Sequence, residues 1–159
     1  MIRGVRESDV DEVVQLVHDL AAYERAPHEC HLTAEQLRAA LFGPSPALFG
    51  HVAEVDGEVV GMSLWYLSFS TWTGTHGLYL EDLFVRPEHR GSGLGRALFL
   101  ALAKECADRG FGRFEWSVLD WNQPAIDFYE AQGASKVIDW FRYRLADEPL
   151  AKAAARADG

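Results

Sequence analysis

The sequence predicts an α/β fold in which helices flank a mixed central β-sheet on both faces. Strand-like and helix-like segments follow one another in the order β-α-α-β-β-β-α-β-α-β, which is typical of a sheet covered by helices. The composition is that of an ordinary globular protein, with 48% hydrophobic and 25% charged residues. The 159 residues suit one domain. We therefore expect a single domain over residues 1–146 and a tail at residues 147–159.

The first elements are a short strand and two helices. Ile2–Val5 favours a strand, and the capping-box-like spacing that begins at Ser8 predicts the start of a helix. Apolar residues then recur with helical spacing at Val10, Val13, Val14, Val17, Leu20 and Ala21. A second capping box at Thr33 predicts a helix that ends at Gly43.

The middle of the chain reads as three strands. Phe49–Val55 and Glu58–Ser68 are separated by Asp56-Gly57, which is a strong hairpin signal because both turn residues need positive φ. A polar loop is expected at Ser70–Gly77, followed by a strand at Leu78–Val85.

Helix and strand alternate in the last third of the chain. The expected elements are a helix from Leu94 to about Asp108, a strand at Phe114–Leu119, a helix at Pro124–Glu130 that Gly133 caps, and a strand at Lys136–Leu145. The Ala-rich tail from Ala146 is expected to be a frayed helix or disordered.

Charge and composition exclude several classes of protein. The net charge of −9 and the pI near 5.0 argue against binding to nucleic acids or anionic membranes and favour cationic partners. The longest apolar run, Ala97–Ala103, is far shorter than the roughly 18 residues of a membrane span. No signal peptide is visible, and two cysteines suit a reducing compartment, so we expect a cytoplasmic protein. His28–His31 lacks a second ligand pair, so no metal is expected.

A glycine-rich segment, Arg90–Gly95, lies between an expected strand and an expected helix. Glycines there let backbone amides converge, and the helix start adds free N–H groups, which is an arrangement that binds phosphate or pyrophosphate. The alternative is a loop whose glycines serve only its turns. The dinucleotide-binding pattern fails at Arg96, and the P-loop pattern fails at Gly95-Arg96-Ala97.

Two segments resemble the signatures of the Gcn5-related N-acetyltransferase (GNAT) superfamily. Leu83–Gly95 resembles its acetyl-CoA motif, Arg/Gln-x-x-Gly-x-Gly/Ala, matched by Arg90, Gly93 and Gly95. Trp121–Tyr129 resembles its second signature. The resemblance implies the GNAT fold, with a sheet splayed at the strand that binds acetyl-CoA, and acetyl-CoA as the co-substrate.

A closer resemblance is to the diamine acetyltransferases, the spermidine/spermine and thialysine enzymes. The similar stretches are Leu20–Glu24, Tyr79–Val85, Arg90–Gly95 and Trp121 through Ser135. This chain has Ser70-Thr71-Trp72 where those enzymes have Asp-Pro-Trp, and Ile138 where they have a Glu two residues before a late Trp. Two cation-binding acids are therefore lost or moved, which disfavours long polyamines as acceptors.

The resemblance assigns two catalytic roles. By this resemblance, Glu81 is expected to be the general base, which takes a proton from the amine directly or through a water. Tyr129 is expected to be the general acid that protonates the CoA thiolate. Strand alternation sends Glu81 and Asp82 to opposite faces and does not decide which one faces the site. The alternatives are a carboxylate paired with an arginine across the sheet and an aromatic residue of the core.

The resemblance also implies binding residues, and each has a purely structural alternative as a turn, cap, core or surface residue. The backbone of Leu83, Phe84 and Val85 would pair with the pantetheine arm like an added strand. The other expected donor-binding residues are Arg90, Gly91, Ser92, Gly93, Leu94, Gly95, Arg96, Asn122, Gln123, Pro124 and Ala125. The expected acceptor-binding residues are Tyr23, Glu24, Trp72, Glu81, Asp139 and Trp140, an acidic and aromatic set that suits a cationic amine.

The resulting hypothesis is an N-acetyltransferase that moves acetyl from acetyl-CoA to a primary amine by direct attack in a ternary complex. The acceptor is expected to be a small polyamine or a lysine-like amine such as thialysine. Other acceptors (a protein amine or an antibiotic) and a catalytically silent acyl-CoA-binding domain are the alternatives. Family members of this kind are homodimers, and the expected strand at Lys136–Leu145, with its aromatic residues, could pack at a twofold interface.

Overall fold

The computed structural model describes residues 1–158, so residue 159 of the expected tail lies outside the described residues. The chain divides into two units, residues 1–119 and the residues from 120 on, which we describe separately. The expected boundary between a domain and a tail at residue 146 stays a prediction.

Residues 1–119 contain a five-stranded mixed sheet with the strand order β1-β2-β3-β4-β5. The strands are β1 (Ile2–Gly4), β2 (Phe49–Val55), β3 (Glu58–Ser70), β4 (Thr75–Val85) and β5 (Phe114–Trp116). Neighbouring strands are antiparallel except for β4 and β5, which are parallel. The mixed sheet confirms the expected fold class.

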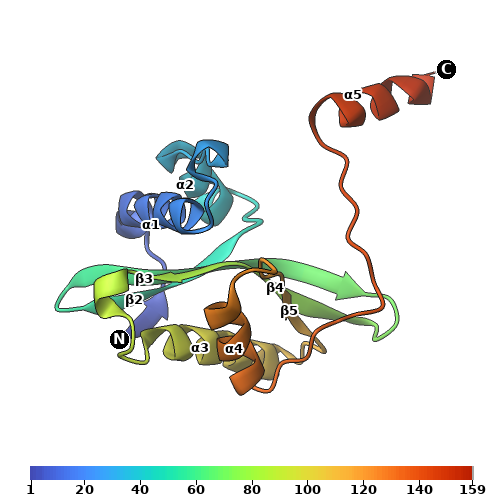
Figure 1. The fold of residues 1–159 in the computed structure, drawn as a ribbon. Helices are drawn as coiled ribbons and strands as arrows, with labels where there is room; N and C mark the ends of the chain where they lie inside the picture. Colours follow the sequence, from blue (N-terminus) through green and yellow to red (C-terminus); the bar gives the residue numbers. More distant parts are fainter. Residues whose placement is uncertain (159) are drawn as a thin grey trace. The chain divides into compact units, whose positions relative to one another are not determined.

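Helices cover both faces of this sheet, as the sequence predicts. α1 (Val10–Tyr23) and α2 (Ala34–Phe42) lie on one face, and α3 (Leu94–Arg109) lies on the other (Figure 1). Each face has its own apolar core. On the α1 side the largest buried members include Leu16, Leu37 and Met62, whereas Trp65, Leu78 and Leu102 are buried on the α3 side.

Local sequence signals account for most helix and turn boundaries. Thr33 caps α2 through its hydroxyl, which accepts from the Gln36 N–H at 3.2 Å, and the Gln36 side chain accepts from the Thr33 N–H at 3.1 Å. Asp56 and Gly57 have φ values of 51° and 84°, which confirms the expected tight hairpin between β2 and β3.

The start of α1 differs from the expected capping box at Ser8. A short 3-10 turn over Glu7–Asp9 precedes the helix, and Asp9 takes the main polar role. Its carboxylate accepts from the Arg6 N–H at 2.7 Å and from the Arg3 guanidinium at 2.7 and 3.0 Å. The hydrogen bond from Arg3 holds the pKa of Asp9 below its ordinary value.

Strand lengths also differ from the prediction near the site. The expected loop Ser70–Gly77 shortens to four residues at positions 71–74, because β3 and β4 pair down to Ser70 opposite Thr75. β5 is shorter than expected and ends at Trp116.

The second unit contains α4 (Gln123–Ala131) and α5 (Asp147–Ala155). The expected strand at Lys136–Leu145 is wrong: residues 136–146 form no strand or helix. Their apolar side chains are between 59% and 92% exposed, namely Val137, Ile138, Trp140, Phe141, Tyr143 and Leu145. Alternation of side chains alone does not make a strand, because a strand also needs a partner edge for its backbone groups.

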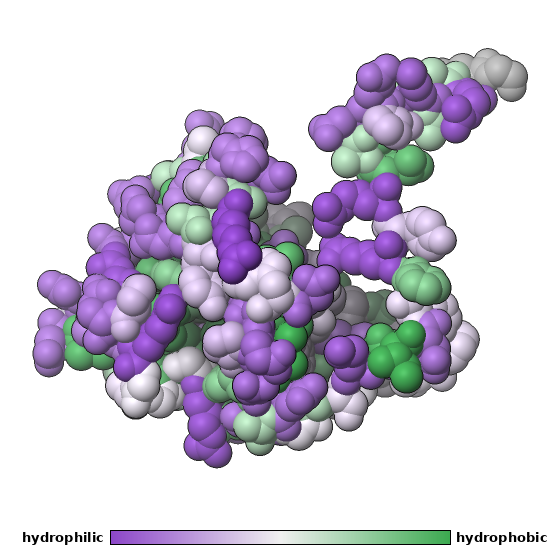
Figure 2. Space-filling view, viewed as in Figure 1, coloured by the Kyte–Doolittle hydropathy of each residue, from purple (hydrophilic) through white to green (hydrophobic). Residues whose placement is uncertain are grey.

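The surface seen in Figure 2 is mainly hydrophilic, with hydrophobic residues scattered among hydrophilic ones. The expected tail forms an ordered helix, α5, followed by a 3-10 turn at Arg156–Asp158. None of the helices in residues 1–158 is both long and apolar enough to cross a bilayer.

Candidate active site

The edge of β4 that faces β5 is open over the last part of the strand. β3 pairs with β4 along its length, but β5 pairs only with the stretch Leu78–Leu80. Within residues 1–158, no strand pairs with this edge of β4 from Glu81 to Val85. An unpaired strand edge offers its N–H and C=O groups to an extended ligand. The sheet is therefore open at the segment expected to bind the pantetheine arm.

A β-bulge lies where this open edge begins. Asp82 is opposite Leu64 and Leu80 is opposite Trp65, so Glu81 is an extra residue of β4. A bulge interrupts the alternation of side chains and is common beside active sites. That expectation depends on the alternation, which the bulge interrupts, so which of Glu81 and Asp82 faces the site stays a prediction.

Three carboxylates interact at this point of β4. Burial raises the pKa of Glu24, at the end of α1, and the negative charge of Glu81 raises it further. Burial also raises the pKa of Asp82 to about 7, with smaller contributions from Glu81 and Glu24. Such a cluster favours a cationic ligand, and Asp82 is an acid that titrates near neutral pH.

The glycine-rich loop follows β4 directly and leads into α3. Gly91 and Gly93 have φ values of 79° and 86°, a region that L-residues rarely adopt, and a Cβ at either position would point into open space. Gly93 precedes the first residue of α3 and contributes no side-chain cap. The first-turn amides of this helix have no acceptor within the helix, so the loop and helix start fit a phosphate group.

Arg90, the first residue of the loop, is held by three neighbours. Its Nε donates to the Val85 carbonyl at 2.9 Å, and its Cζ lies 5.2 Å from the centre of the Tyr23 ring and 5.1 Å from that of Phe84. The sequence motif marks Arg90 as part of the loop, but it carries no signal for these ring contacts, because Tyr23 lies on a distant helix. Two residues of the expected site, Tyr23 and Arg90, are therefore in contact.

Trp72 lies apart from the carboxylates. It is 82% exposed in the loop between β3 and β4. From Thr75, at the start of β4, the strand runs about 20 Å to Glu81 if it is extended. The fold thus does not bring Trp72 and Glu81 of one chain together, and the acceptor-binding role of Trp72 stays a prediction.

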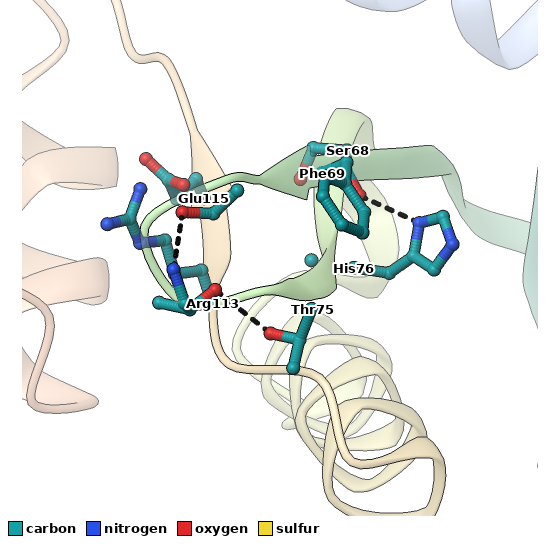
Figure 3. A pocket seen from close by; sticks show the side chains of 9 residues that line it. Ser68, Phe69, Thr75, His76, Arg113 and Glu115 are labelled. Carbon is teal, nitrogen blue, oxygen red and sulfur yellow. Dashed lines mark hydrogen bonds between the residues drawn. The ribbon is translucent and has the colours of Figure 1, made fainter.

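An open pocket lies at the start of β4, beside Thr75 (Figure 3). Its lining residues are Ser68, Phe69, Ser70, Thr73, Thr75, His76, Gly77, Arg113 and Glu115. Several of its polar groups bond to one another: His76 Nδ1 contacts the Ser68 carbonyl at 3.1 Å, and the Thr73 and Thr75 hydroxyls are 3.0 Å apart. It lies away from Glu81, so we do not assign it to the transfer reaction.

The second unit carries the remaining expected site residues. Asn122 is buried and caps α4, accepting from the Ala125 N–H at 3.4 Å, and Pro124 lies in the first turn. The structural alternative for Asn122, a helix cap, is thus confirmed, and its donor-binding role stays a prediction. Tyr129 lies on α4, where its ring meets that of Phe128 edge-on at 5.3 Å.

The last two expected acceptor residues, Asp139 and Trp140, lie in the exposed segment that follows α4. In the described part of the chain, no three His, Cys, Asp or Glu residues form a group that could hold a metal ion. Cys30 and Cys106 are both free thiols.

Known acetyltransferases are similar to this chain over most of its length. Residues 13–134 match the acetyltransferase (GNAT) family. Thialysine N-epsilon-acetyltransferase of Mus musculus is 36% identical over 98% of this chain and 97% of its own length. L-ornithine N5-acetyltransferase of Arabidopsis thaliana is 29% identical over 94% of this chain and 85% of its own length.

Solved structures share the fold. An integron cassette protein from the mobile metagenome of V. cholerae superposes with a TM-score of 0.81 at 24% identity, over 97% of this chain and 96% of the other. The chain belongs to the GNAT family of acetyltransferases. It is an N-acetyltransferase, and the co-substrate of this family is acetyl-CoA.

Proposed function

We propose that this protein transfers the acetyl group of acetyl-CoA to the primary amine of a small cationic acceptor. The acceptor is a small polyamine or a lysine-like amine such as thialysine. The observation that carries this proposal is the cluster of Glu24, Glu81 and Asp82 at the point where the edge of β4 opens. A negative cluster beside a donor strand suits an acceptor that arrives as an ammonium ion.

The reaction needs one proton acceptor and one proton donor. A lysine-like amine has a pKa near 10.4, so it must lose a proton before its nitrogen attacks the thioester carbonyl. Glu81 takes that proton, directly or through a water. The C–N bond forms, the C–S bond breaks, and Tyr129 protonates the departing thiolate. No covalent enzyme intermediate is required, because the free amine is itself a good nucleophile.

The donor is bound by the open strand and the glycine loop. The backbone of Leu83–Val85 pairs with the pantetheine arm, and the amides from Gly91 to Arg96 bind the pyrophosphate. The positive φ of Gly93 and the free first turn of α3 support this placement. Asn122–Ala125 supply further donor contacts. Val85 offers fewer free backbone groups to the pantetheine arm than expected, because its carbonyl already accepts a hydrogen bond from Arg90.

The acceptor is bound by charge and by aromatic rings. Glu24 supplies negative charge, and Tyr23 supplies a ring for the ammonium group. Asp139 and Trp140 are further acceptor residues in this proposal. Trp72 would join them only from a second copy of the chain, because within one chain it lies far along β4 from Glu81. The names of two relatives, a thialysine and an ornithine acetyltransferase, point to amines of this size.

We also propose a homodimer in the cytoplasm. The exposed segment at residues 137–145 carries three aromatic side chains, Trp140, Phe141 and Tyr143, that are between 69% and 92% exposed. Exposed aromatic and aliphatic side chains gathered in one short segment are typical of an interaction surface, and a second copy of the chain would cover them. The two free cysteines are compatible with a reducing compartment.

The test is release of free CoA thiol from acetyl-CoA with a panel of amines: thialysine, lysine, ornithine, putrescine, spermidine and an aminoglycoside. We expect the highest kcat/KM with thialysine or a short diamine, and mass spectrometry should find one acetyl group on the amine nitrogen. Transfer only to the aminoglycoside would contradict the acceptor assignment. Binding of acetyl-CoA without transfer to any amine would indicate the catalytically silent alternative.

A further inference from the structure

One side chain links the donor loop to the acceptor end of α1. Arg90 begins the glycine loop, and Tyr23 is the last residue of α1. The guanidinium of Arg90 lies near the rings of both Tyr23 and Phe84, at 5.2 and 5.1 Å. Its Nε donates to the Val85 carbonyl at the end of β4. The loop, the strand and the helix end therefore meet at one residue.

The acceptor carboxylate follows Tyr23 directly in the chain. The turn that ends α1 is fixed by three backbone bonds: Glu24 N–H to Leu20 at 2.8 Å, Arg25 N–H to Ala22 at 3.1 Å and Ala26 N–H to Ala21 at 2.9 Å. Whatever holds the Tyr23 ring in place thus also holds Glu24 near Glu81.

The opposite end of α1 has a separate attachment. Arg86, which directly follows β4, donates to the Glu12 carboxylate in the first turn of α1. With the start of the helix held there, a change at Arg90 acts on the end of the helix that carries Tyr23 and Glu24.

We propose that Arg90 is a positioning residue that couples the binding of the two substrates. When acetyl-CoA orders the glycine loop, Arg90 is held over Tyr23, the end of α1 is stabilised, and Glu24 stays beside Glu81 and Asp82. This rests on the proposed function, because it assigns the loop to the donor and the carboxylates to the acceptor. The coupling is reciprocal: a bound acceptor must tighten the donor by the same factor.

An arginine suits this role better than a lysine. Its planar guanidinium can stack on aromatic rings while Nε donates a hydrogen bond, whereas an ammonium group is a compact charge on a flexible stem. Each cation–π contact at an exposed site corresponds to about a two- to fivefold change in an equilibrium constant. Only the Tyr23 contact joins the loop to α1, because Phe84 lies on β4, so the coupling should be about two- to fivefold.

Hydrogen–deuterium exchange with CoA as the probe tests the proposal without an acceptor. In the wild type, saturating CoA should slow exchange of the amides at residues 24–26 by about twofold or more. Arg90→Lys and Tyr23→Leu should lose this protection, whereas Tyr23→Phe keeps the ring and should retain it. The matched control is Arg38→Lys. Arg38 lies on α2, away from the end of α1, and makes an exposed ion pair with Glu7. Calorimetry sets a saturating CoA concentration for each variant.

The second readout is the ratio of the CoA Kd measured without and with the best amine of the panel. We expect a ratio of about two to five in the wild type and near one in Arg90→Lys and Tyr23→Leu. If Arg90 and Tyr23 had only a structural role, Arg90→Lys and Tyr23→Leu would melt at a lower temperature but keep the wild-type ratio of CoA Kd values. That result would overturn the proposal. CoA binding with no protection of residues 24–26 in the wild type would also overturn it while leaving the proposed function intact. Absence of any CoA binding would overturn both.

Discussion

Glu24 at the end of α1 lies within electrostatic reach of Glu81 in the bulge of β4: burial raises the pKa of the Glu24 carboxyl, and the charge of Glu81 raises it further. Asp82 adds a third acid to the same place. Carboxylates gathered in this way disfavour the folded state, so they are expected at a functional site rather than in a stabilising network.

Replacing Asp82 with asparagine should stabilise the protein at neutral and alkaline pH. Burial and its acidic neighbours raise the pKa of Asp82 from 3.8 to about 7, so the ionised form is disfavoured in the folded state. The free-energy cost of holding Asp82 ionised in the folded protein is absent below its pKa in the unfolded chain. This cost grows as the pH rises towards 7 and is complete above that value. At pH 8, Asp82→Asn should raise the free energy of unfolding by about 1–3 kcal/mol.

Urea unfolding of the wild type and Asp82→Asn at pH 8 and pH 5 measures this effect. The difference in the free energy of unfolding between the wild type and Asp82→Asn should be smaller at pH 5 than at pH 8. A difference of equal size at both pH values, or a variant that is less stable at pH 8, would show that Asp82 is not a disfavoured charge.

Local signals predicted most of the fold because the chemistry that they encode is itself local. The capping box at Thr33 and the Asp56-Gly57 turn each involve only a few consecutive residues, and both form as expected. The expected strand at Lys136–Leu145 fails because a strand depends on a partner edge, which alternation of side chains does not reveal.

The sequence predicts a set of candidate site residues but not their arrangement. The glycine motif indicates a candidate donor loop, since that chemistry is contained in one short segment. The bulge at Glu81 depends on the register between β3 and β4, and the contact between Arg90 and Tyr23 joins distant segments. Neither leaves a pattern in one sequence.

Substitutions at two glycines of the loop should separate donor binding from stability. Gly93 has a φ of 86°, so Gly93→Ala is strained and should weaken acetyl-CoA binding by about tenfold or more. Gly95 lies within α3, and a Cβ there would meet Val85 Cγ2 at 3.9 Å, an ordinary contact. Gly95→Ala is therefore the matched control and should bind normally. Calorimetric affinities that are equal for the two variants would contradict the placement of the pyrophosphate.

The exposed segment after α4 should be covered in solution. Light scattering should give about twice the monomer mass of 17.8 kDa. The double variant Phe141→Asp with Tyr143→Asp should be monomeric, because it places charge in the proposed interface. Leu100→Asp alters an exposed apolar residue on α3 and should leave the dimer intact. A wild-type protein that is monomeric at micromolar concentration would contradict the proposed homodimer.

Removing the hydroxyl of Tyr129 should slow the chemical step. Tyr129→Phe keeps the ring but cannot protonate the thiolate, so kcat should fall by about 10²-fold or more with little change in KM. The defect should persist at high pH, because deprotonating the amine does not replace the lost acid. Tyr79→Phe removes a hydroxyl that lies 2.8 Å from the Ser117 hydroxyl, at a position with no role in the proposed reaction, and serves as the control. Full activity of Tyr129→Phe would exclude the acid role.

The most direct test of acetyl transfer to an amine with Glu81 as the base is the pH profile of kcat/KM for Glu81→Gln. With the best amine of the panel, the variant should lose about 10²–10⁴-fold at pH 7. It should recover towards the wild-type rate at alkaline pH, where more of the amine is already deprotonated. Glu35→Gln, on the first turn of α2, is the control. A Glu81→Gln enzyme with wild-type kcat/KM at pH 7 would contradict the account and make Asp82 the next candidate for the base.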